Sequence, residues 1–336
     1  MGISIKWIEY SLPERVETNA DLALENPDWE MDNIQAKSGV IERHIAGDQE
    51  TALDLSIRAC EKIFAHADLS PATIDGIVFC TQTPDYIMPS NAFLVHKQFS
   101  FSSRVFAFDY NLACSGYIYG LAIVRGLLAT GLAKNVLLIN ADTYSKLINK
   151  KDRSTRVLFG DAAAASIITS DESASDIVDI SLSTSGKDFN CFYVPGGGCR
   201  LPQNNMVNPA NEDSNKANLT PHDIHMNGFA VWRFIATTVP TSILSLLEKN
   251  NLSVDTIDLF LFHQASKMTL ESLVKELKIP ERKVFSNLSH IGNTVSASIP
   301  ILLKDAIEQS RVKRGDIILL SGFGVGLSWG SVIMRF

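Results

Sequence analysis

The 336-residue sequence has few charged residues, few cysteines and no excess of basic side chains. Charged residues make up 20% of the chain and hydrophobic residues 46%, a balance that excludes an intrinsically disordered protein. The 30 basic and 37 acidic residues give a net charge of −7, so we expect no nucleic acid among its partners. The composition indicates a globular protein with a large apolar core.

The chain also lacks the cysteine pattern of a disulfide framework, because its five cysteines are an odd and scattered set. They are Cys60, Cys80, Cys114, Cys191 and Cys199. A reducing, cytoplasmic setting fits this usage best. The N-terminal segment has no basic stretch followed by a long apolar one, so we expect no secretory signal. The most apolar run, 117–133, contains an arginine and three glycines and is too short to span a bilayer, so we expect no membrane association.

Helical and strand-like patterns alternate through the chain, which is typical of an α/β protein with helices covering its sheets. Residues 51–66 place four apolar side chains on one face and predict an amphipathic helix. Residues 73–80 read TIDGIVFC and predict a buried strand that follows this helix.

This supersecondary unit occurs twice. Residues 256–263 read TIDLFLFH and repeat the Thr, Ile, Asp and Phe of the first strand in register, the Phe being the second one of this segment. In the first half a predicted helix over 114–130 leads into a strand over 135–141. In the second half a helix over 296–309 leads into a strand over 316–321. Two ordered copies, about 180 residues apart, predict an internal duplication.

The duplication predicts two halves, 1–175 and 226–336, joined by a long connecting loop region over 176–225. Residues 186–225 combine three consecutive glycines with several prolines and asparagines, which predicts a long surface loop. Loops of this length in compact proteins are commonly functional. A helical pattern resumes over 229–250, where a proline is expected to kink the helix.

Three polar side chains stand at strand-to-helix junctions. Cys114 opens a helix whose dipole would favour the thiolate form of a nucleophile, although a small buried apolar role also fits. His263 ends the repeated strand of the second half, and Asn293 lies in a Gly-Asn-Thr turn. Their alternative interpretations are a surface or hydrogen-bonded core histidine for His263, and a turn residue or helix cap for Asn293. Because equivalent junctions of a duplicated unit can meet, we expect the three to share one cleft.

Glycine-rich segments and scattered metal-ligand types complete the candidates. Residues 159–165 and 321–330 are not phosphate loops, because neither carries the required lysine or glycine spacing. Their backbone N–H groups could face a developing oxyanion, or they could be tight hairpin turns. The side chains of Cys191, Cys199, His222 and His225 match no standard zinc spacing, so we expect no metal site.

These residues resemble the motifs of one enzyme family. Cys114 in NLACSGY, His263 in HQA and Asn293 in GNTVSAS resemble the three active-site motifs of β-ketoacyl-acyl-carrier-protein synthase III. The closing segment GFGVGLSWGS and the early segment GVIERHI resemble further motifs of that family, and the resemblance runs from about residue 37 to the end. It implies the thiolase fold, a duplicated αβαβα five-layer sandwich, and a homodimer.

The resemblance also implies a mechanism, the decarboxylative condensation of an acyl-CoA primer with malonyl-acyl-carrier protein. The Cys114 thiolate would attack the acyl-CoA, and backbone N–H groups of Cys114 and Val325 would form the oxyanion hole. Malonyl-carrier protein would then lose carbon dioxide, with His263 and Asn293 hydrogen-bonding the enolate oxygen. Such a reaction, in fatty-acid initiation or a related pathway, would use acyl-CoA and acyl carrier protein as substrates and no cofactor.

Binding residues follow from the same resemblance. Arg153 and Trp29 would hold the CoA adenine, Met88 would reach the partner subunit's acyl pocket, and Asn227-Gly228 would contact pantetheine. The full set implied for CoA and substrate is Trp29, Met88, Arg153, Asn227, Gly228 and Ser266. The set implied for the acidic carrier protein is Arg233, Gln264, Lys267 and Lys275.

Two alternatives keep the same family. One is acyl transfer from Cys114 to a different acceptor, by ester formation or to a non-malonyl nucleophile. The other is a catalytically silent homologue that acts as a binding partner, against which the intact Cys-His-Asn set argues. The segment 81–85 offers no glutamate of the kind that hydroxymethylglutaryl-CoA synthases use, and Val325 replaces the proline typical of plant-type polyketide synthases.

Overall fold

The computed structural model describes residues 2–66, 69–170, 176–202 and 219–336. Its first sheet has five strands in the order β1-β7-β6-β4-β5. These are β1 (Ser4–Ser11), β7 (Ala162–Thr169), β6 (Asn135–Asp142), β4 (Gly76–Cys80) and β5 (Phe106–Tyr110). Strand β4 runs parallel to both β5 and β6, whereas β7 is antiparallel to β6 and to β1.

The second sheet repeats this arrangement with four strands in the order β11-β12-β13-β8. They are β11 (Leu259–Phe262), β12 (Ile317–Gly324), β13 (Ser328–Arg335) and β8 (Asp176–Thr184). Strand β11 is parallel to β12, and β13 is antiparallel to β12 and to β8, as in the first sheet. A single parallel bridge between Phe260 and Val284 stands where the first sheet has β5. The topology therefore confirms the duplication that the sequence predicts.

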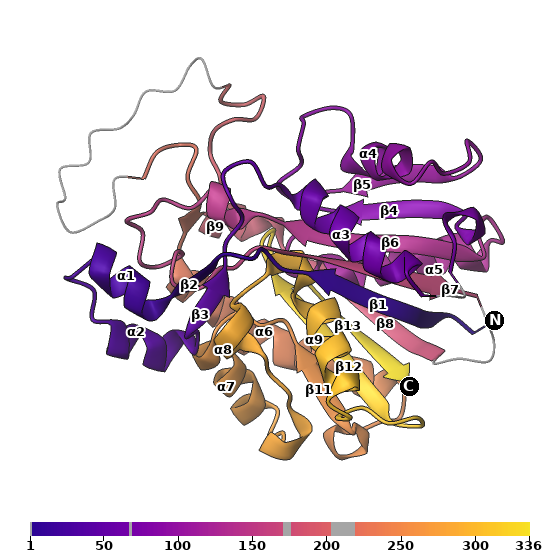
Figure 1. The fold of residues 1–336 in the computed structure, drawn as a ribbon. Helices are drawn as coiled ribbons and strands as arrows, with labels where there is room; N and C mark the ends of the chain where they lie inside the picture. Colours follow the sequence, from indigo (N-terminus) through magenta and orange to yellow (C-terminus); the bar gives the residue numbers. More distant parts are fainter. Residues whose placement is uncertain (1, 67–68, 171–175, 203–218) are drawn as a thin grey trace.

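Helices separate and cover the two sheets, as Figure 1 shows. Helices α3 (Ala52–Phe64) and α4 (Asn91–Gln98) pack on the outer face of the first sheet. Helices α5 (Gly116–Ala129) and α9 (Ser298–Glu308) lie between the sheets, in a core that takes side chains from both. Helices α6 (Gly228–Lys249) and α7 (Lys267–Glu276) cover the outer face of the second sheet. The fold is thus the predicted five-layer αβαβα sandwich.

Shorter elements gather at one end of the molecule, away from both chain termini (Figure 1). Strands β2 and β3 pair with each other, and so do β9 and β10. The elements are β2 (Val16–Thr18), α1 (Asn19–Glu25), α2 (Met31–Ser38), β3 (Glu42–His44), β9 (Phe192–Tyr193), β10 (His225–Met226) and α8 (Leu288–Ile291). These elements surround the ends of the central strands.

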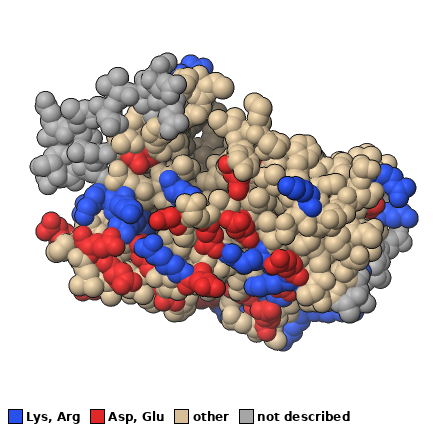
Figure 2. Space-filling view, turned by 45° about the horizontal axis from the view of Figure 1, so that its top comes forward, with Lys and Arg blue, Asp and Glu red and all other residues tan. Residues whose placement is uncertain are grey.

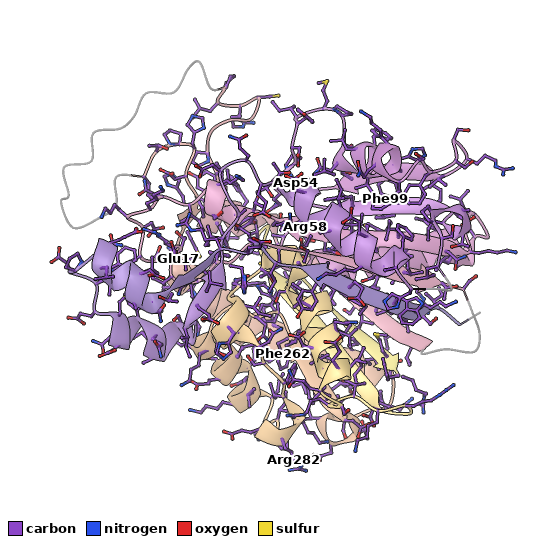
Figure 3. The ribbon with its side chains drawn as sticks, viewed as in Figure 1. Glu17, Asp54, Arg58, Phe99, Phe262 and Arg282 are labelled. Atoms are coloured by element: carbon purple, nitrogen blue, oxygen red, sulfur yellow. The ribbon has the colours of Figure 1, made fainter. Side chains whose placement is uncertain are left out.

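Local sequence explains the two kinds of helix. Helix α3 starts at a capping box, in which Thr51 and Asp54 each satisfy a backbone N–H of the other, and it buries one face. Figure 3 shows Asp54 and Arg58 on this helix. Helix α5 is apolar on nearly all sides because it lies in the central layer. Its Gly120 is required there, since a Cβ would lie 2.3 Å from the Tyr110 hydroxyl and 2.9 Å from Leu138.

The predicted boundaries need correction in the connecting region. Residues 176–184 form β8, an edge strand of the second sheet, so the second half begins at 176 rather than 226. The segment 186–225 contains a 3₁₀ turn over 186–191 and both members of the β9–β10 pair begin within it. Part of the predicted loop, 203–218, lies outside the described residues. Helix α6 continues through Pro240 and ends at Lys249.

Helix α6 is also, among the described residues, the one helix long and apolar enough to cross a membrane by length and composition. One third of its most apolar window is buried inside the protein. Its Ile235, Val239 and Ile243 pack in the core under the second sheet, which is the arrangement of a core helix in a globular protein.

Candidate active site

Cys114, His263 and Asn293 line one pocket of about 500 Å³. Cys114 lies between β5 and α5, and His263 directly follows β11. Phe262, the last residue of β11, is labelled in Figure 3. Asn293 follows α8 and precedes the turn that leads into α9. The structure therefore brings together the three junctions that the sequence singled out.

Glycines of β12 allow the second half to approach the nucleophile closely. A Cβ on Gly324 would lie 2.8 Å from Cβ and 2.9 Å from Sγ of Cys114. A Cβ on Gly322 would lie 2.7 Å from the carbonyl oxygen of Cys114. Strands β12 and β13 form a hairpin, and the Val325 N–H at its turn donates a hydrogen bond to the Cys114 sulfur. The hairpin interpretation of this glycine-rich segment is therefore confirmed, and its turn also carries a donor to the sulfur.

Cys114 is buried, with 4% of its surface exposed. Burial raises the pKa of its thiol to about 12, and the charge of Asp142 adds to this effect, while backbone N–H groups of Val325 and Cys114 oppose it. The helix begins only at Gly116, two residues later. The expectation that the helix dipole favours the thiolate is therefore wrong for the free protein, because desolvation outweighs it.

His263 is a buried histidine with 1% of its surface exposed. Its backbone N–H donates to the Ser321 carbonyl (2.9 Å), and its ring packs edge-on against Phe323. Burial lowers the pKa of the imidazole to about 3, so the ring is neutral at physiological pH. Neither ring nitrogen finds a hydrogen-bond partner within the part of the chain that the structure describes. Buried polar groups rarely stay unpartnered, so a ligand is the natural partner of this ring.

Three hydrogen bonds to neighbouring backbone groups hold Asn293 in place. Its backbone N–H donates to the Leu158 carbonyl (2.8 Å), and its own carbonyl accepts from the Gly160 N–H (3.0 Å). Its side-chain Oδ1 accepts from the Val295 N–H at 3.0 Å. The side-chain NH₂ is thereby left as the group that can donate into the pocket. The helix-cap alternative does not describe Asn293, because α9 begins at Ser298.

The other glycine-rich segment packs closely against the backbone that precedes Asn293. The early GVIERHI motif holds the wall of the pocket. A Cβ on Gly160 would lie 2.6 Å from the Ile291 carbonyl oxygen, so the backbone there can approach only without a side chain. The fully buried Arg43 donates to Asn19 Oδ1 (2.6 Å) and to the Val157 carbonyl (3.0 Å). Val157 lines the pocket, so the hydrogen bond from Arg43 holds part of the pocket wall in place.

Some of the binding residues implied by the sequence lie at this pocket and others do not. Arg153, Gly228 and Ser266 line it. Asn227 caps α6, its side chain accepting from the Ala230 N–H at 3.1 Å. Met88 lies outside the lining and is 80% exposed.

Trp29 is not among the residues that line the pocket, although its neighbour Glu30 is, and its place opposite Arg153 stays a prediction. Its backbone N–H bonds to the Asn26 carbonyl in a turn that precedes α2. The pocket wall is formed instead by Glu30 and by residues of α2 itself. The indole that does line the pocket belongs to Trp232 on α6, and it donates to Ser272 Oγ at 3.1 Å. Trp232 lies one helical turn after Gly228 in the sequence, and this spacing is the signal that could have placed its indole at the pocket.

Three of the four predicted carrier-protein contacts lie on the surface, and the fourth is buried. Arg233, Lys267 and Lys275 are exposed on α6 and α7. Gln264 is wrong as a contact, because it is 1% exposed and its polar atoms are used internally. Its Nε2 donates to the Phe262 carbonyl (2.8 Å), and its Oε1 accepts from Ser286 Oγ (2.5 Å).

The cysteines and histidines of the connecting segment form no metal site among the described residues. Across the described ranges, no group of three or more His, Cys, Asp or Glu side chains is placed to hold a metal ion. His225 instead contacts the Thr220 carbonyl through Nε2 at 2.9 Å.

The raised thiol pKa predicts how Cys114 reacts with a small alkylating reagent. Because the pKa is near 12, the thiolate fraction should rise about tenfold per pH unit from pH 7 to 9. His263, with a pKa near 3, adds no inflection in this range. Peptide-resolved mass spectrometry of iodoacetamide-treated protein measures the rate at Cys114. A rate that levels off below pH 8 would contradict a protonated thiol.

Comparisons with known proteins agree with this geometry. Two family models match the chain, 3-oxoacyl-[acyl-carrier-protein] synthase III over residues 108–186 and its C-terminal domain over residues 247–336. The β-ketoacyl-[acyl-carrier-protein] synthase III of Fusobacterium nucleatum is 37% identical, covering 100% of this chain and 99% of its own. A crystal structure of a 3-oxoacyl-(acyl-carrier-protein) synthase III is 37% identical over the whole of both chains, with a TM-score of 0.96. That of the Aquifex aeolicus enzyme is 34% identical over the same coverage, with a TM-score of 0.88.

A thiolase-type sandwich with cysteine, histidine and asparagine in one pocket defines a condensing enzyme, an acyltransferase that acts through a thioester. The chain belongs to the β-ketoacyl-acyl-carrier-protein synthase III family, the condensing enzymes of fatty-acid initiation.

Proposed function

We propose that the chain condenses an acyl-CoA primer with malonyl-acyl-carrier protein through an acyl-Cys114 intermediate. The observation that carries the proposal is the pocket itself. It holds a buried thiol, an unpartnered neutral imidazole and an amide NH₂. Those are the nucleophile and the two hydrogen-bond donors that the two halves of such a reaction need.

In the first half-reaction, Cys114 Sγ loses its proton and forms a bond to the thioester carbonyl carbon of the acyl-CoA. The oxyanion of the tetrahedral intermediate accepts hydrogen bonds from the backbone N–H groups of Cys114 and Val325, which already face the sulfur. The carbon–sulfur bond to CoA then breaks, and CoA leaves as the free thiol after taking up the proton.

In the second half-reaction, the malonyl thioester oxygen lies between His263 and Asn293. The neutral imidazole N–H and the amide NH₂ donate to that oxygen as loss of carbon dioxide turns the thioester into an enolate. The enolate carbon attacks the acyl-cysteine carbonyl, the bond to Cys114 Sγ breaks, and a β-ketoacyl-carrier protein is released. The Cys114 thiolate that leaves takes up a proton from solvent and returns to the resting thiol. The substrates supply every reacting atom, so we propose no cofactor.

The mouth of the pocket suits the long, polar arm of CoA. Arg153 and Trp232 both line it and offer a guanidinium and an indole, the two groups that stack well on a planar base. Gly228 and Ser266 line the path between this mouth and Cys114 and are proposed to contact pantetheine. Asn227 supports that path by capping α6.

An acidic carrier protein is proposed to dock beside this mouth. Arg233, Lys267 and Lys275 are exposed on the two helices that border it. Lys267 and Lys275, with Lys278, also line a neighbouring groove along α7. The chain as a whole is acidic, so these basic side chains, which share the groove with Glu271 and Glu281, are the groups proposed to guide an acidic partner to the site.

We also propose a homodimer that works in the cytoplasm, with no membrane or nucleic acid among its partners. Tyr86, Ile87, Met88 and Phe93 are large apolar side chains exposed on one side of the first half. Figure 2 shows mostly uncharged surface on the side where Figure 1 places α4, whereas charges of both signs mix elsewhere on that face. A second copy covering this surface would bury the apolar side chains and bring Met88 to its partner's pocket.

Intact-protein mass spectrometry tests the function. The protein is incubated with a panel of acyl-CoAs, and malonyl-carrier protein is then added. We expect an acyl adduct on Cys114 that discharges into a β-ketoacyl-carrier protein. An adduct that persists would instead favour transfer to a different acceptor, and failure of every donor to form an adduct would favour a silent homologue.

A further inference from the structure

Asp142 is a buried carboxyl group to which the proposed steps give no role. It ends β6 in the first half of the chain and has no exposed surface. Its carboxylate accepts from the Gln82 N–H (2.8 Å), the Ser296 N–H (3.3 Å) and Ser296 Oγ (2.5 Å). All three donors are neutral, and burial together with the nearby Asp161 raises the pKa of Asp142 to about 7. A carboxyl group kept under these conditions needs an explanation.

Ser296, which Asp142 holds through two hydrogen bonds, lies in the 3₁₀ turn Val295–Ala297 between Asn293 and α9. Val295 in that turn has a φ of 53°, in the left-handed region that a β-branched residue rarely adopts. It is also completely buried. Conformations of this kind persist only where the surroundings fix them, and they concentrate at functional sites.

The unusual conformation of Val295 has a direct effect on Asn293. The Val295 N–H donates to Asn293 Oδ1 at 3.0 Å, which fixes the rotation of the amide. With Oδ1 turned toward the backbone, the NH₂ is the end that can face the malonyl thioester. A turn that relaxed would release Oδ1, and the amide could then present its oxygen, an acceptor, to a developing negative charge.

We propose that Asp142 is a positioning residue for the condensation half-reaction: by holding Ser296 it fixes the 295–297 turn, which directs the Asn293 NH₂ toward the thioester oxygen. This inference rests on the proposed roles of Cys114 and Asn293. The link crosses between the two halves of the chain, since Asp142 and Ser296 are 154 residues apart.

The same carboxylate affects Cys114 in the opposite direction. Its charge helps to raise the pKa of the Cys114 thiol and so disfavours the thiolate. Removing that charge should therefore leave the acylation half-reaction unchanged or faster, while the condensation half-reaction loses a positioned donor. A merely structural role would slow both halves together.

The test measures both half-reactions in the full-length Asp142→Asn variant. Acylation is followed by intact mass after mixing with acyl-CoA, and condensation is followed by discharge of the purified acyl-enzyme with malonyl-carrier protein. We expect condensation to fall about 100-fold, the size typical of a misplaced catalytic group, with acylation at least as fast as in the wild type. An unchanged ratio of the two rates would overturn the proposal.

Asp109→Asn is the matched control, because Asp109 is a half-buried carboxyl group on strand β5 of the same sheet that bonds to the Asn91 and Ala92 N–H groups, outside the pocket lining. Its condensation-to-acylation ratio should stay at the wild-type value, and a drop equal to that of Asp142→Asn would overturn the proposal. If Asp142→Asn does not fold, Ser296→Ala decides. It loses one of the two Ser296 hydrogen bonds to Asp142, so we expect a drop of about tenfold in condensation alone. A wild-type protein that fails either half-reaction would contradict the proposed function rather than this inference.

Discussion

Replacing Cys114 with alanine is expected to abolish covalent acylation by every acyl-CoA and, with it, all formation of β-ketoacyl product. The sulfur is the only reactive atom that faces both the Val325 N–H and the pocket among the described side chains that line it. Loss of a covalent nucleophile removes the intermediate itself, so we expect turnover to fall by at least about 10⁴-fold. Intact mass after incubation with acyl-CoA, together with a product assay, measures both effects.

Cys199→Ala is the control for this substitution, because Cys199 is exposed and lies outside the pocket. It should acylate and turn over like the wild type. Cys114→Ala should also keep its melting temperature within a few degrees, since the change removes one buried atom. An acyl group found on the Cys114→Ala protein would contradict the assignment of the nucleophile.

Replacing His263 or Asn293 with alanine should separate the two halves of the reaction. Both side chains are proposed to donate only to the enolate oxygen, and neither is needed to form the acyl-enzyme. Removing one preorganised donor of this kind costs roughly 10²–10³ in rate, so condensation should fall by that factor while the acyl-cysteine still forms. Purified acyl-enzyme of each variant, mixed with malonyl-carrier protein, shows whether the adduct persists.

His290→Ala is the matched control for the histidine. Its side chain is 68% exposed and lies three residues before Asn293, paired with Glu42 at 3.3 Å. We expect both half-reactions to proceed at wild-type rates. If His263→Ala were instead to lose acylation and condensation equally, His263 would have to act on the thiol, and its assignment to the enolate would be wrong.

Sequence reasoning was most successful where local pattern and chemistry coincide. The repeated TIDxxxF strands and the helices that follow them predict the duplicated layers, and the motifs around Cys114, His263 and Asn293 predict the residues that share the pocket. Each of these features depends on a short segment whose neighbours in the sequence are also its neighbours in the fold. The fold class and the three central residues could therefore be predicted.

The sequence-based predictions fail where contacts between residues far apart in the chain determine the structure. Residues 176–184 were assigned to a connecting loop, yet they pair with β13 at the far end of the chain. Gln264 lies beside His263 in the motif, but a turn of the backbone buries its amide against Phe262 and Ser286. The pKa of Cys114 depends on burial in the folded protein and on the charge of Asp142, which no local pattern encodes.

Trp29 and Trp232 also show that a motif in the sequence does not by itself identify the residues that line a pocket. Trp29 was assigned to the CoA site by its proximity to an early motif, whereas the turn before α2 keeps it out of the pocket lining. Trp232 reaches the pocket because α6 packs across α7, and its indole is fixed by Ser272. Helix packing therefore decides that Trp232 lines this pocket.

Helices α5 and α9 form the central layer between the sheets. This layer couples assembly of the active site to docking of the two halves. Cys114 lies just before one of these helices, and Asn293 lies just before the turn that leads into the other. Their side chains share one core, so neither helix is fully covered until both copies of the repeat have docked. A chain in which only the first half has folded would hold the thiol but not the two groups proposed to stabilise the enolate. We therefore expect the proposed reaction to need both halves docked on the central layer.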